Sequence, residues 1–199
     1  MHECWLWLVE GSAVSDAALD PFACWLGASE RERLGLFVRR ERQRQFLIGR
    51  VLLRRMLGRV LDVDPGSVRL LERHGQAPQL AMAGLEAVGF SLSHSGPWVA
   101  CAVSADTALG LDIELRKPAR DLSALAAQAF DADENAWLAA RPQAHRVRDF
   151  YRLWSTKEAR FKLHAPSAQC FAPEHAELAV ALCSAQPLAR APALELVPF

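Results

Sequence analysis

Residues 109–115 read Leu-Gly-Leu-Asp-Ile-Glu-Leu, so large apolar side chains alternate with acidic or very small ones. Alternation with a period of two predicts a β-strand that is buried on one face. Side chains at positions i and i+2 leave a strand on the same side, so Asp112 and Glu114 project together from the face opposite Leu111 and Ile113. The segment is therefore expected to be a half-buried strand with both carboxylates on one side.

The acidic pair of this strand has two interpretations. Two carboxylates held this close repel each other unless a cation or a proton lies between them, and hard oxygen ligands suit Mg²⁺ or Mn²⁺. The alternative is a polar strand face in contact with water, because an Asp-x-Glu pattern is short and common.

A second segment, residues 154–162, reads Trp-Ser-Thr-Lys-Glu-Ala-Arg-Phe-Lys. Glu158 and Lys162 stand four positions apart, so on a helix they share one face and can reach one ligand. Lys157 and Lys162 are two of only three lysines in a chain that otherwise uses arginine. The alternative for Glu158 and Lys162 is an ordinary surface ion pair.

A third segment, residues 90–99, reads Phe-Ser-Leu-Ser-His-Ser-Gly-Pro-Trp-Val. It alternates like a strand and ends in hydroxyls, an imidazole and a turn. Small donors at a strand end are suited to hydrogen-bond phosphate oxygens. A lone histidine such as His94 can equally be a structural hydrogen-bonding residue.

Taken in order, S-x-S-H-S, G-x-D-x-E and W-S-x-K-E-A-x-x-x-K resemble the motif set of the 4′-phosphopantetheinyl transferases, in particular the monomeric surfactin-type branch. The resemblance extends over residues 1–165. Its further matches are residues 29–33, residues 46–54, Arg116-Lys117-Pro118 and residues 150–153.

The resemblance implies transfer of the phosphopantetheine arm of coenzyme A to a serine of an apo acyl or peptidyl carrier protein. It implies Mg²⁺, with Mn²⁺ as a substitute, held by Asp112, Glu114 and Glu158. Asp112, Glu158 and Lys162 are then the catalytic residues. Glu158 is the candidate general base, and Lys162 stabilises charge on the leaving phosphate. A water activated by the metal at Asp112 or Glu114 is the rival base.

Binding of coenzyme A needs cations, and residues 30–59 carry ten arginines against three glutamates. The resemblance implies that Arg31 and Arg33 contact the 3′-phosphate, with Arg50 on the following helix, while Ser93, His94 and Lys162 contact the nucleotide or its phosphates. We assign four other arginines to a solvated helix face. They are Arg39, Arg40, Arg42 and Arg59.

The sequence departs from the family pattern in two places. The family has a basic residue in a Gly-Lys-Pro turn, whereas residues 74–78 read His-Gly-Gln-Ala-Pro. Either Gln76 supplies a neutral hydrogen bond there, or Arg73 or His74 supplies the cation. The glycine that commonly follows the last lysine is replaced by Leu163, and we expect an abbreviated C-terminal half.

The expected fold is α+β, with two similar α/β halves in the pseudo-twofold arrangement of the family. Residues 1–105 form the half that binds coenzyme A, and residues 106–199 carry the metal site and the catalytic helix. Helices are expected within residues 28–61, 122–130, 133–140 and 147–164. Strands are expected at residues 5–9, 68–72, 89–93, 98–104, 108–114, 175–184 and 193–197, although the last segment could equally be a loose tail.

Composition excludes several classes of protein. No apolar run approaches the length that spans a bilayer, and the first residues lack a basic stretch before a hydrophobic one, so a cytoplasmic protein is expected. The five cysteines lack C-x-x-C spacing and are expected to be reduced, buried thiols. Zero net charge argues against a nucleic-acid binder built on the arginines and on Trp5, Trp7 and Trp25.

The carrier protein is the expected macromolecular partner of a monomeric enzyme. Residues 121–140 lie where the family binds its carrier, although core packing is the alternative for their apolar side chains. A second functional class also stays open, namely a protein of the same fold that binds coenzyme A or a carrier without catalysis. The altered turn at residues 74–78 and the short tail are the features that favour it.

Overall fold

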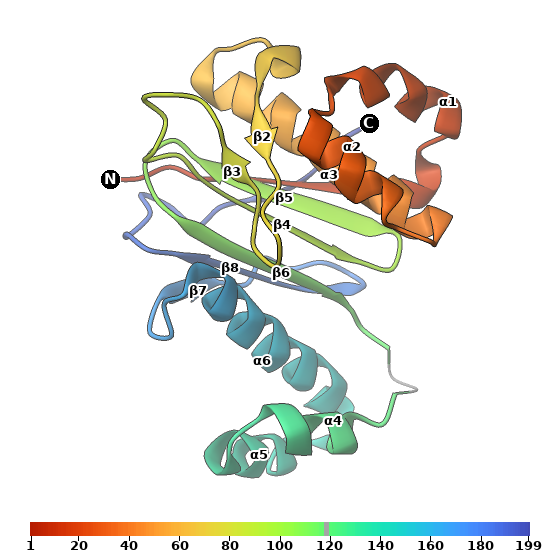
Figure 1. The fold of residues 1–199 in the computed structure, drawn as a ribbon. Coiled ribbons are helices and arrows are strands. Elements are labelled where there is room, and N and C mark those ends of the chain that lie inside the picture. Colours follow the sequence, from red (N-terminus) through yellow and green to blue (C-terminus); the bar gives the residue numbers. More distant parts are fainter. Residues whose placement is uncertain (118–119) are drawn as a thin grey trace.

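The structure is a computed structural model that describes residues 1–117 and 120–199 (Figure 1). Two β-sheets stack face to face, and a long helix covers the outer face of each. The first half contributes α1 (Asp16–Leu19), α2 (Ala28–Gly35), α3 (Arg40–Leu61), β1 (Trp5–Glu10), β2 (Leu70–Leu71), β3 (Gln79–Leu80), β4 (Gly89–Ser95) and β5 (Trp98–Ser104). The second half contributes β6 (Leu109–Leu115), α4 (Leu122–Ala129), α5 (Ala132–Ala139), α6 (Gln143–Leu163), β7 (Gln169–Phe171), β8 (Leu178–Ser184) and β9 (Leu194–Leu196).

The first sheet has the order β4-β5-β1-β9. Strand β5 pairs antiparallel with both β1 and β4, and β9 pairs parallel with β1. One face packs against the apolar side of α3, where Leu52, Leu53 and Met56 are buried with Cys101 and Val103 of β5. The alternation of side chains in β1 and β5 thus supplies one face to α3 and the other to the second sheet.

The second sheet has the order β6-β8-β7, and α6 covers its outer face. The helix lies very close to β6, since a Cβ atom placed on Gly110 would lie 2.0 Å from the carbonyl oxygen of Ala159. Only glycine fits under such a helix. This close approach brings the face of β6 that carries Asp112 and Glu114 against α6, with Asp112 bonded to Lys162 near the end of the helix.

The inner faces of the two sheets form a shared core. Leu6 and Leu8 of β1 pack against Leu111 and Ile113 of β6 and Leu182 of β8, all of them fully or almost fully buried. The prediction of an α+β fold with two α/β halves is confirmed, because each half packs its longest helix on the outer side of its own sheet. Strand β6 follows the alternation of residues 109–115 with Leu111 and Ile113 inward.

The last strand crosses from the second half into the first. β9 adds to the edge of β1, and the ring of Phe199 contacts that of Phe22 at 5.8 Å between centroids. The final segment is therefore a strand rather than a loose tail. This strand, which follows the second half in the chain, extends the first sheet and not the second.

The prediction of five reduced, buried thiols was wrong. Cys170 on β7 and Cys183 on β8 stand directly opposite each other in the antiparallel register and form a disulfide. Cys4, Cys24 and Cys101 are free, and Cys24 is exposed. The number and spacing of cysteines do not report which two become cross-strand neighbours, because that depends on the register of the sheet.

Two further findings bear on the predictions. Within residues 1–117 and 120–199, no helix is both long enough and apolar enough to cross a membrane. Pro118, part of the Arg-Lys-Pro match that follows the acidic strand, lies outside the described residues.

Candidate active site

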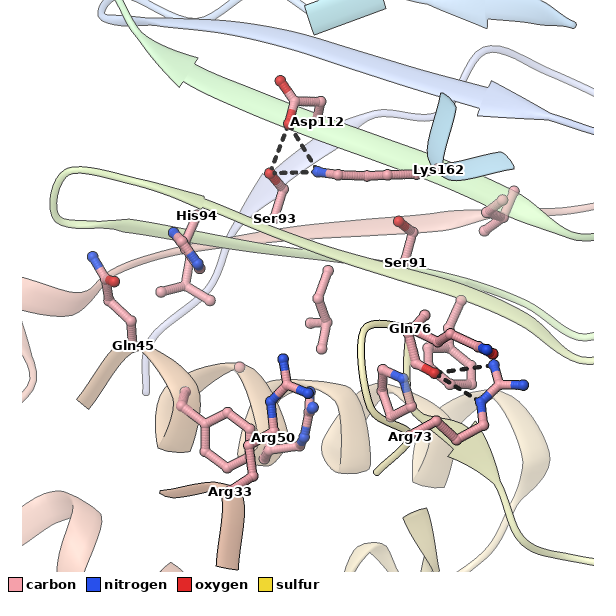
Figure 2. Close-up of a pocket in the computed structure, with 18 of the residues that line it drawn as sticks. Arg33, Gln45, Arg50, Arg73, Gln76, Ser91, Ser93, His94, Asp112 and Lys162 are labelled. Atoms are coloured by element: carbon pink, nitrogen blue, oxygen red, sulfur yellow. Dashed lines mark hydrogen bonds and ion pairs between the residues drawn. The ribbon is translucent and has the colours of Figure 1, made fainter. Parts of the chain in front are cut away.

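A cavity of about 1080 Å³ opens where the two halves meet. The first half contributes α3, β4 and the turn at residues 73–78, and the second half contributes Asp112 of β6 and Lys162 of α6. Figure 2 shows Asp112, Ser93 and Lys162 joined by hydrogen bonds on one wall, with Arg33 and Arg50 on the opposite wall. The cavity thus has a cationic side and a side that carries a carboxylate and an ammonium group.

The cationic wall is held by buried ion pairs beneath it. Arg50 donates from Nε to Oε1 of Glu72 at 2.9 Å and lies 3.4 Å from Oε1 of Glu30. Arg54 donates from Nη1 to Oε1 of Glu30 at 2.9 Å, and both of these side chains are almost completely buried. Burial lowers the pKa of Arg50, and the Glu72 carboxylate opposes that effect. The two carboxylates therefore hold Arg50 in a fixed orientation.

Arg33 is the freer arginine of this wall. Its side chain is 40% exposed, and Nη1 lies 3.4 Å from Oε2 of Glu72. Arg73 lines the cavity with Gln76 and donates from Nε to the carbonyl oxygen of Ala77 at 3.1 Å. Arg73 therefore places a guanidinium beside the turn in which the sequence lacks a basic residue.

His94 lies at the cavity with Arg42 beside it, at 2.6 Å from Arg42 Nη1 to His94 Nε2. Although part of the residue stays exposed, loss of water around the ring lowers its pKa from 6.5 to about 4, and the positive charges of Arg42 and Lys162 add to the shift. His94 is accordingly neutral at pH 7 in the ligand-free protein. An anion bound there would favour its charged form.

The carboxylate side is built by β4, β6 and α6. Asp112 is buried, and its Oδ1 atom accepts hydrogen bonds from Lys162 Nζ at 2.8 Å and from Ser93 Oγ at 3.1 Å. Its Oδ2 atom is buried and has no hydrogen-bond partner. Such an atom is costly unless something else satisfies it, and a cation can do so.

Glu114 lies next along the same face of β6. Its Oε2 atom accepts a hydrogen bond of 2.8 Å from Ser95 Oγ. Burial raises the pKa of Glu114, the bond from Ser95 opposes that rise, and the charge of Asp112 adds to it. A divalent cation between the two carboxylates would reverse this mutual repulsion.

Glu158 lies on α6 one turn before Lys162 and one turn after Trp154, so the three side chains share a helix face. Lys162 bonds to Asp112, and Trp154 lines a small hollow together with Glu114. Glu158 is thus carried on the turn of α6 between Trp154, which lines the hollow with Glu114, and Lys162, which bonds to Asp112.

Across the described residues, no three His, Cys, Asp or Glu side chains are gathered closely enough to hold a metal ion. The structure therefore does not gather Asp112, Glu114 and Glu158 into one cluster, although their carboxylate oxygens are of the kind that a divalent cation takes. Asp112 offers a buried oxygen without a partner, Glu114 is a carboxylate whose pKa is raised by burial and by the charge of Asp112, and Glu158 is an oxygen donor on α6.

The structure brings most of the predicted site residues to one cavity. Those that line it are Arg33, Arg50, Gln76, Ser93, His94, Asp112 and Lys162. Arg31, Glu114 and Glu158 are not among its lining residues. Arg31 is exposed and instead donates from its guanidinium to the carbonyl oxygen of Leu26.

Arg42 was assigned to a solvated helix face, yet it lines the cavity and contacts His94. A helical stripe could have identified it. The cavity-lining residues of α3 are spaced at intervals of three and four and so form one face of the helix. They are Arg42, Gln45, Phe46, Gly49 and Arg50.

Two family models match the chain. A model described as the 4′-phosphopantetheinyl transferase superfamily matches residues 108–188, and one described as 4′-phosphopantetheinyl transferase, N-terminal, matches residues 15–106. The boundary between the two matches falls at the junction of the two halves.

Individual relatives carry the same description. The 4′-phosphopantetheinyl transferase HetI of Nostoc sp. is 34% identical over 92% of this chain and 78% of its own length. The transferase Sfp of Bacillus subtilis is 30% identical over 71% of this chain, and the transferase AcpT of Salmonella typhi is 31% identical over 64%. The matches cover 61% and 62% of those two proteins, so the chain spans about three fifths of their length.

Proposed function

The chain belongs to the 4′-phosphopantetheinyl transferase superfamily, and we propose that it transfers the 4′-phosphopantetheine group of coenzyme A to a serine of an apo acyl or peptidyl carrier protein. In this reaction the serine oxygen forms a bond to the β-phosphorus of coenzyme A. The bond from that phosphorus to the bridging oxygen breaks, the serine loses its proton, and adenosine 3′,5′-bisphosphate leaves.

One observation carries the proposal. A single cavity has several arginines on one wall and Asp112 with Lys162 on the other. Coenzyme A carries a 3′-phosphate and a diphosphate, so it needs cations at one end and charge control at the reacting phosphorus. The cavity is also of the size that holds a large cofactor.

We assign the nucleotide end of coenzyme A to the arginine wall. Arg33 and Arg73 are the guanidinium groups that can turn towards a phosphate, because neither is enclosed by buried carboxylates on all sides. Arg50 keeps its ion pairs with Glu72 and Glu30 and supports the wall from below. Arg42 and neutral His94 face the phosphates near the C-terminal end of β4. Gln76 contributes an amide from the turn at residues 74–78.

We assign a Mg²⁺ ion to Asp112, Glu114 and Glu158. When bound, the ion would neutralise charge on the diphosphate and so make the phosphorus easier to attack. Asp112 would offer Oδ2, the oxygen that has no partner within the protein.

We assign acid–base chemistry to the end of α6. Glu158 is the proposed acceptor of the serine proton, which its position on the same helix face as Lys162, one turn away, supports. Lys162 lines the cavity with its ammonium group directed at Asp112, from which it can stabilise negative charge on the leaving phosphate.

The resemblance further supports a monomeric, cytoplasmic enzyme that serves carriers of fatty-acid, polyketide or nonribosomal-peptide synthesis. Sedimentation of the purified protein tests whether it is a monomer. Parallel incubations with one purified apo carrier from each of the three classes test which carriers it serves.

The activity is tested by the intact mass of a purified apo carrier after incubation with coenzyme A and Mg²⁺. We expect a mass gain of one phosphopantetheine, lost in Asp112→Asn and Glu158→Gln and retained in Glu86→Gln, a control at an exposed carboxylate of the first half. If coenzyme A binds but no carrier gains mass, the protein is a binding protein of the same fold, and the proposed chemistry is wrong.

A further inference from the structure

Three serines of β4 accept hydrogen bonds from the backbone N–H groups along the unpaired edge of β6. Ser91, Ser93 and Ser95 stand at alternate positions, so all three hydroxyls point from the same face of β4. Each accepts a hydrogen bond from a backbone N–H group of β6 that has no strand partner on that side. The distances are 2.9 Å from Leu111 N to Ser91 Oγ, 3.2 Å from Ile113 N to Ser93 Oγ and 3.0 Å from Leu115 N to Ser95 Oγ.

A serine hydroxyl has one hydrogen to donate and two lone pairs to accept, so each of these serines still has its hydrogen available. Ser93 donates to Oδ1 of Asp112 at 3.1 Å, and Ser95 donates to Oε2 of Glu114 at 2.8 Å. In both cases the serine accepts from one residue of β6 and donates to the side chain of the residue before it.

The third serine has the same place but a different neighbour. Ser91 accepts from Leu111 N, and the preceding residue is Gly110, which has no side chain to receive a hydrogen bond. Ser91 therefore caps the strand edge without holding a carboxylate. It is a matched control for the other two serines within the same strand.

Ser93 also has no bonding capacity left for a ligand. Its hydrogen goes to Asp112, and its two lone pairs accept from Ile113 N and, at 3.2 Å, from Lys162 Nζ. A phosphate oxygen could be bound by this hydroxyl only if the bond to Asp112 broke. The local geometry thus favours a role for Ser93 within the protein over the coenzyme A contact that the resemblance implies.

We propose that Ser93 and Ser95 are positioning residues that orient Asp112 and Glu114. Each serine fixes one oxygen of its carboxylate and leaves the other free for a divalent cation. This inference rests on the proposed function, since it assumes that these carboxylates bind the metal. The buried Oδ2 atom of Asp112, which has no partner in the protein, is the oxygen that the arrangement leaves open.

The first test concerns the ion-free protein. Crystal structures of the wild type, Ser91→Ala and Ser93→Ala are expected to show the Asp112 carboxylate rotated or spread over several rotamers only in Ser93→Ala. Ser93→Thr, which retains the hydroxyl, is expected to restore the wild-type orientation. An unchanged Asp112 side chain in Ser93→Ala would overturn the inference, whatever the protein catalyses.

The second test measures Mn²⁺ binding by titration with electron paramagnetic resonance. Loss of a residue that orients a metal ligand typically weakens affinity about 10- to 100-fold. We expect a loss of Mn²⁺ affinity of this size for Ser93→Ala and Ser95→Ala, and recovery in Ser93→Thr. Ser91→Ala should keep the wild-type affinity, although loss of the hydrogen bond to Leu111 N should lower its midpoint of denaturation as in the other two alanine variants. Equal losses in Ser91→Ala and Ser93→Ala would contradict a positioning role.

The two tests separate this inference from the proposed function. A wild-type protein that binds no Mn²⁺ would remove the metal from the proposed function, while the orientation of Asp112 by Ser93 would still be decided by the crystal structures. If the wild type binds Mn²⁺ and both Ser93→Ala and Ser95→Ala bind it with the same affinity, the metal stays in the proposed function and the role of the serines is overturned.

Discussion

Lys162 on α6 donates a hydrogen bond of 2.8 Å from Nζ to Oδ1 of Asp112 on β6. Its ammonium group also donates to the carbonyl oxygen of Leu111 at 2.9 Å and to Ser93 Oγ at 3.2 Å. One lysine thus satisfies a backbone acceptor at the edge of β6 and the charge of a buried carboxylate. It ties the proposed catalytic helix to the strand that carries the proposed metal ligands.

Replacement of Lys162 by Met keeps much of the stem and removes these three bonds. We expect the free energy of unfolding to fall by about 1–3 kcal/mol, because Asp112 and Leu111 lose partners in a largely buried place. Urea denaturation measures the change. Lys157→Met on the same helix is the control, since its bond to Glu134 is more exposed and should be worth less than about 1 kcal/mol. Equal losses would show that the Asp112 contact is not special.

Arg33 should discriminate coenzyme A from its 3′-dephospho analogue. We expect Arg33→Ala to raise KM for coenzyme A more than KM for the analogue, because a guanidinium that binds the 3′-phosphate matters only when that phosphate is present. Arg31→Ala is the control, because Arg31 bonds to Leu26 and does not line the cavity. Equal increases for both ligands would remove Arg33 from the 3′-phosphate site, and an effect in Arg31→Ala would restore the role that the resemblance implied for it.

Arg73 should replace the cation that the turn at residues 74–78 lacks. We expect Arg73→Gln to weaken binding of coenzyme A, as measured by calorimetry, and Gln76→Lys to recover part of the loss by restoring a positive charge at the turn. If Arg73→Gln leaves the binding of coenzyme A unchanged, Gln76 is the residue that contacts coenzyme A at this turn.

The buried ion pair between Arg54 and Glu30 should matter more to stability than an exposed pair on the same helix. Arg54→Met leaves a buried carboxylate with a weakened set of partners, which typically costs about 3–5 kcal/mol. Arg40→Met removes a guanidinium that is 76% exposed and should cost less than about 1 kcal/mol. The two free energies of unfolding come from matched denaturation curves, and similar values would contradict the structural role given to the Glu30 pair.

His94 should titrate far below an ordinary histidine. Its pKa is lowered to about 4, so between pH 6.5 and about 4 the unfolded chain binds a proton that the folded protein does not. Stability contributed by this group is therefore full above pH 6.5 and falls as the pH drops towards 4. Proton NMR of the ring measures the pKa directly.

Two changes should raise that pKa. Arg42→Ala removes a neighbouring positive charge, and coenzyme A brings negative phosphates to the cavity, so each should favour the charged ring. A pKa of His94 near 6.5 in the unmodified, ligand-free protein would contradict the described surroundings of the ring.

Local patterns predicted the parts of the fold that depend on neighbouring residues. The alternation at residues 109–115 correctly gave β6 and the shared face of Asp112 and Glu114, and residues 98–104 were predicted with the bounds of β5. The helical region predicted for residues 28–61 forms two separate helices, because α2 ends at Gly35 and α3 begins at Arg40.

Features that depend on long-range pairing could not be read from local patterns. The parallel addition of β9 to β1 and the disulfide between Cys170 and Cys183 are set by which strands become neighbours. The same holds for the serines of β4. In the sequence, the alternating hydroxyls indicated hydrogen-bond donors to phosphate. Only the structure, in which β6 lies beside β4, shows that the Ser93 hydroxyl already bonds to Asp112 and Ile113.

The site was predicted unevenly for a physical reason. Motif spacing placed Asp112 and Lys162 in segments that meet, whereas the arginines of residues 30–59 are too numerous to sort by charge alone. Burial sorts them, because Arg50 and Arg54 pair with carboxylates inside the protein while Arg33 stays free to move.

The central claim is that one cavity between the two halves binds coenzyme A by its arginine wall and a divalent cation by its carboxylate wall. A crystal structure with coenzyme A and Mg²⁺ tests it most directly. The account predicts the 3′-phosphate beside Arg33 or Arg73, and the ion on Asp112 Oδ2 together with Glu114 or Glu158. Coenzyme A bound outside this cavity, or an ion that does not touch Asp112, would contradict it.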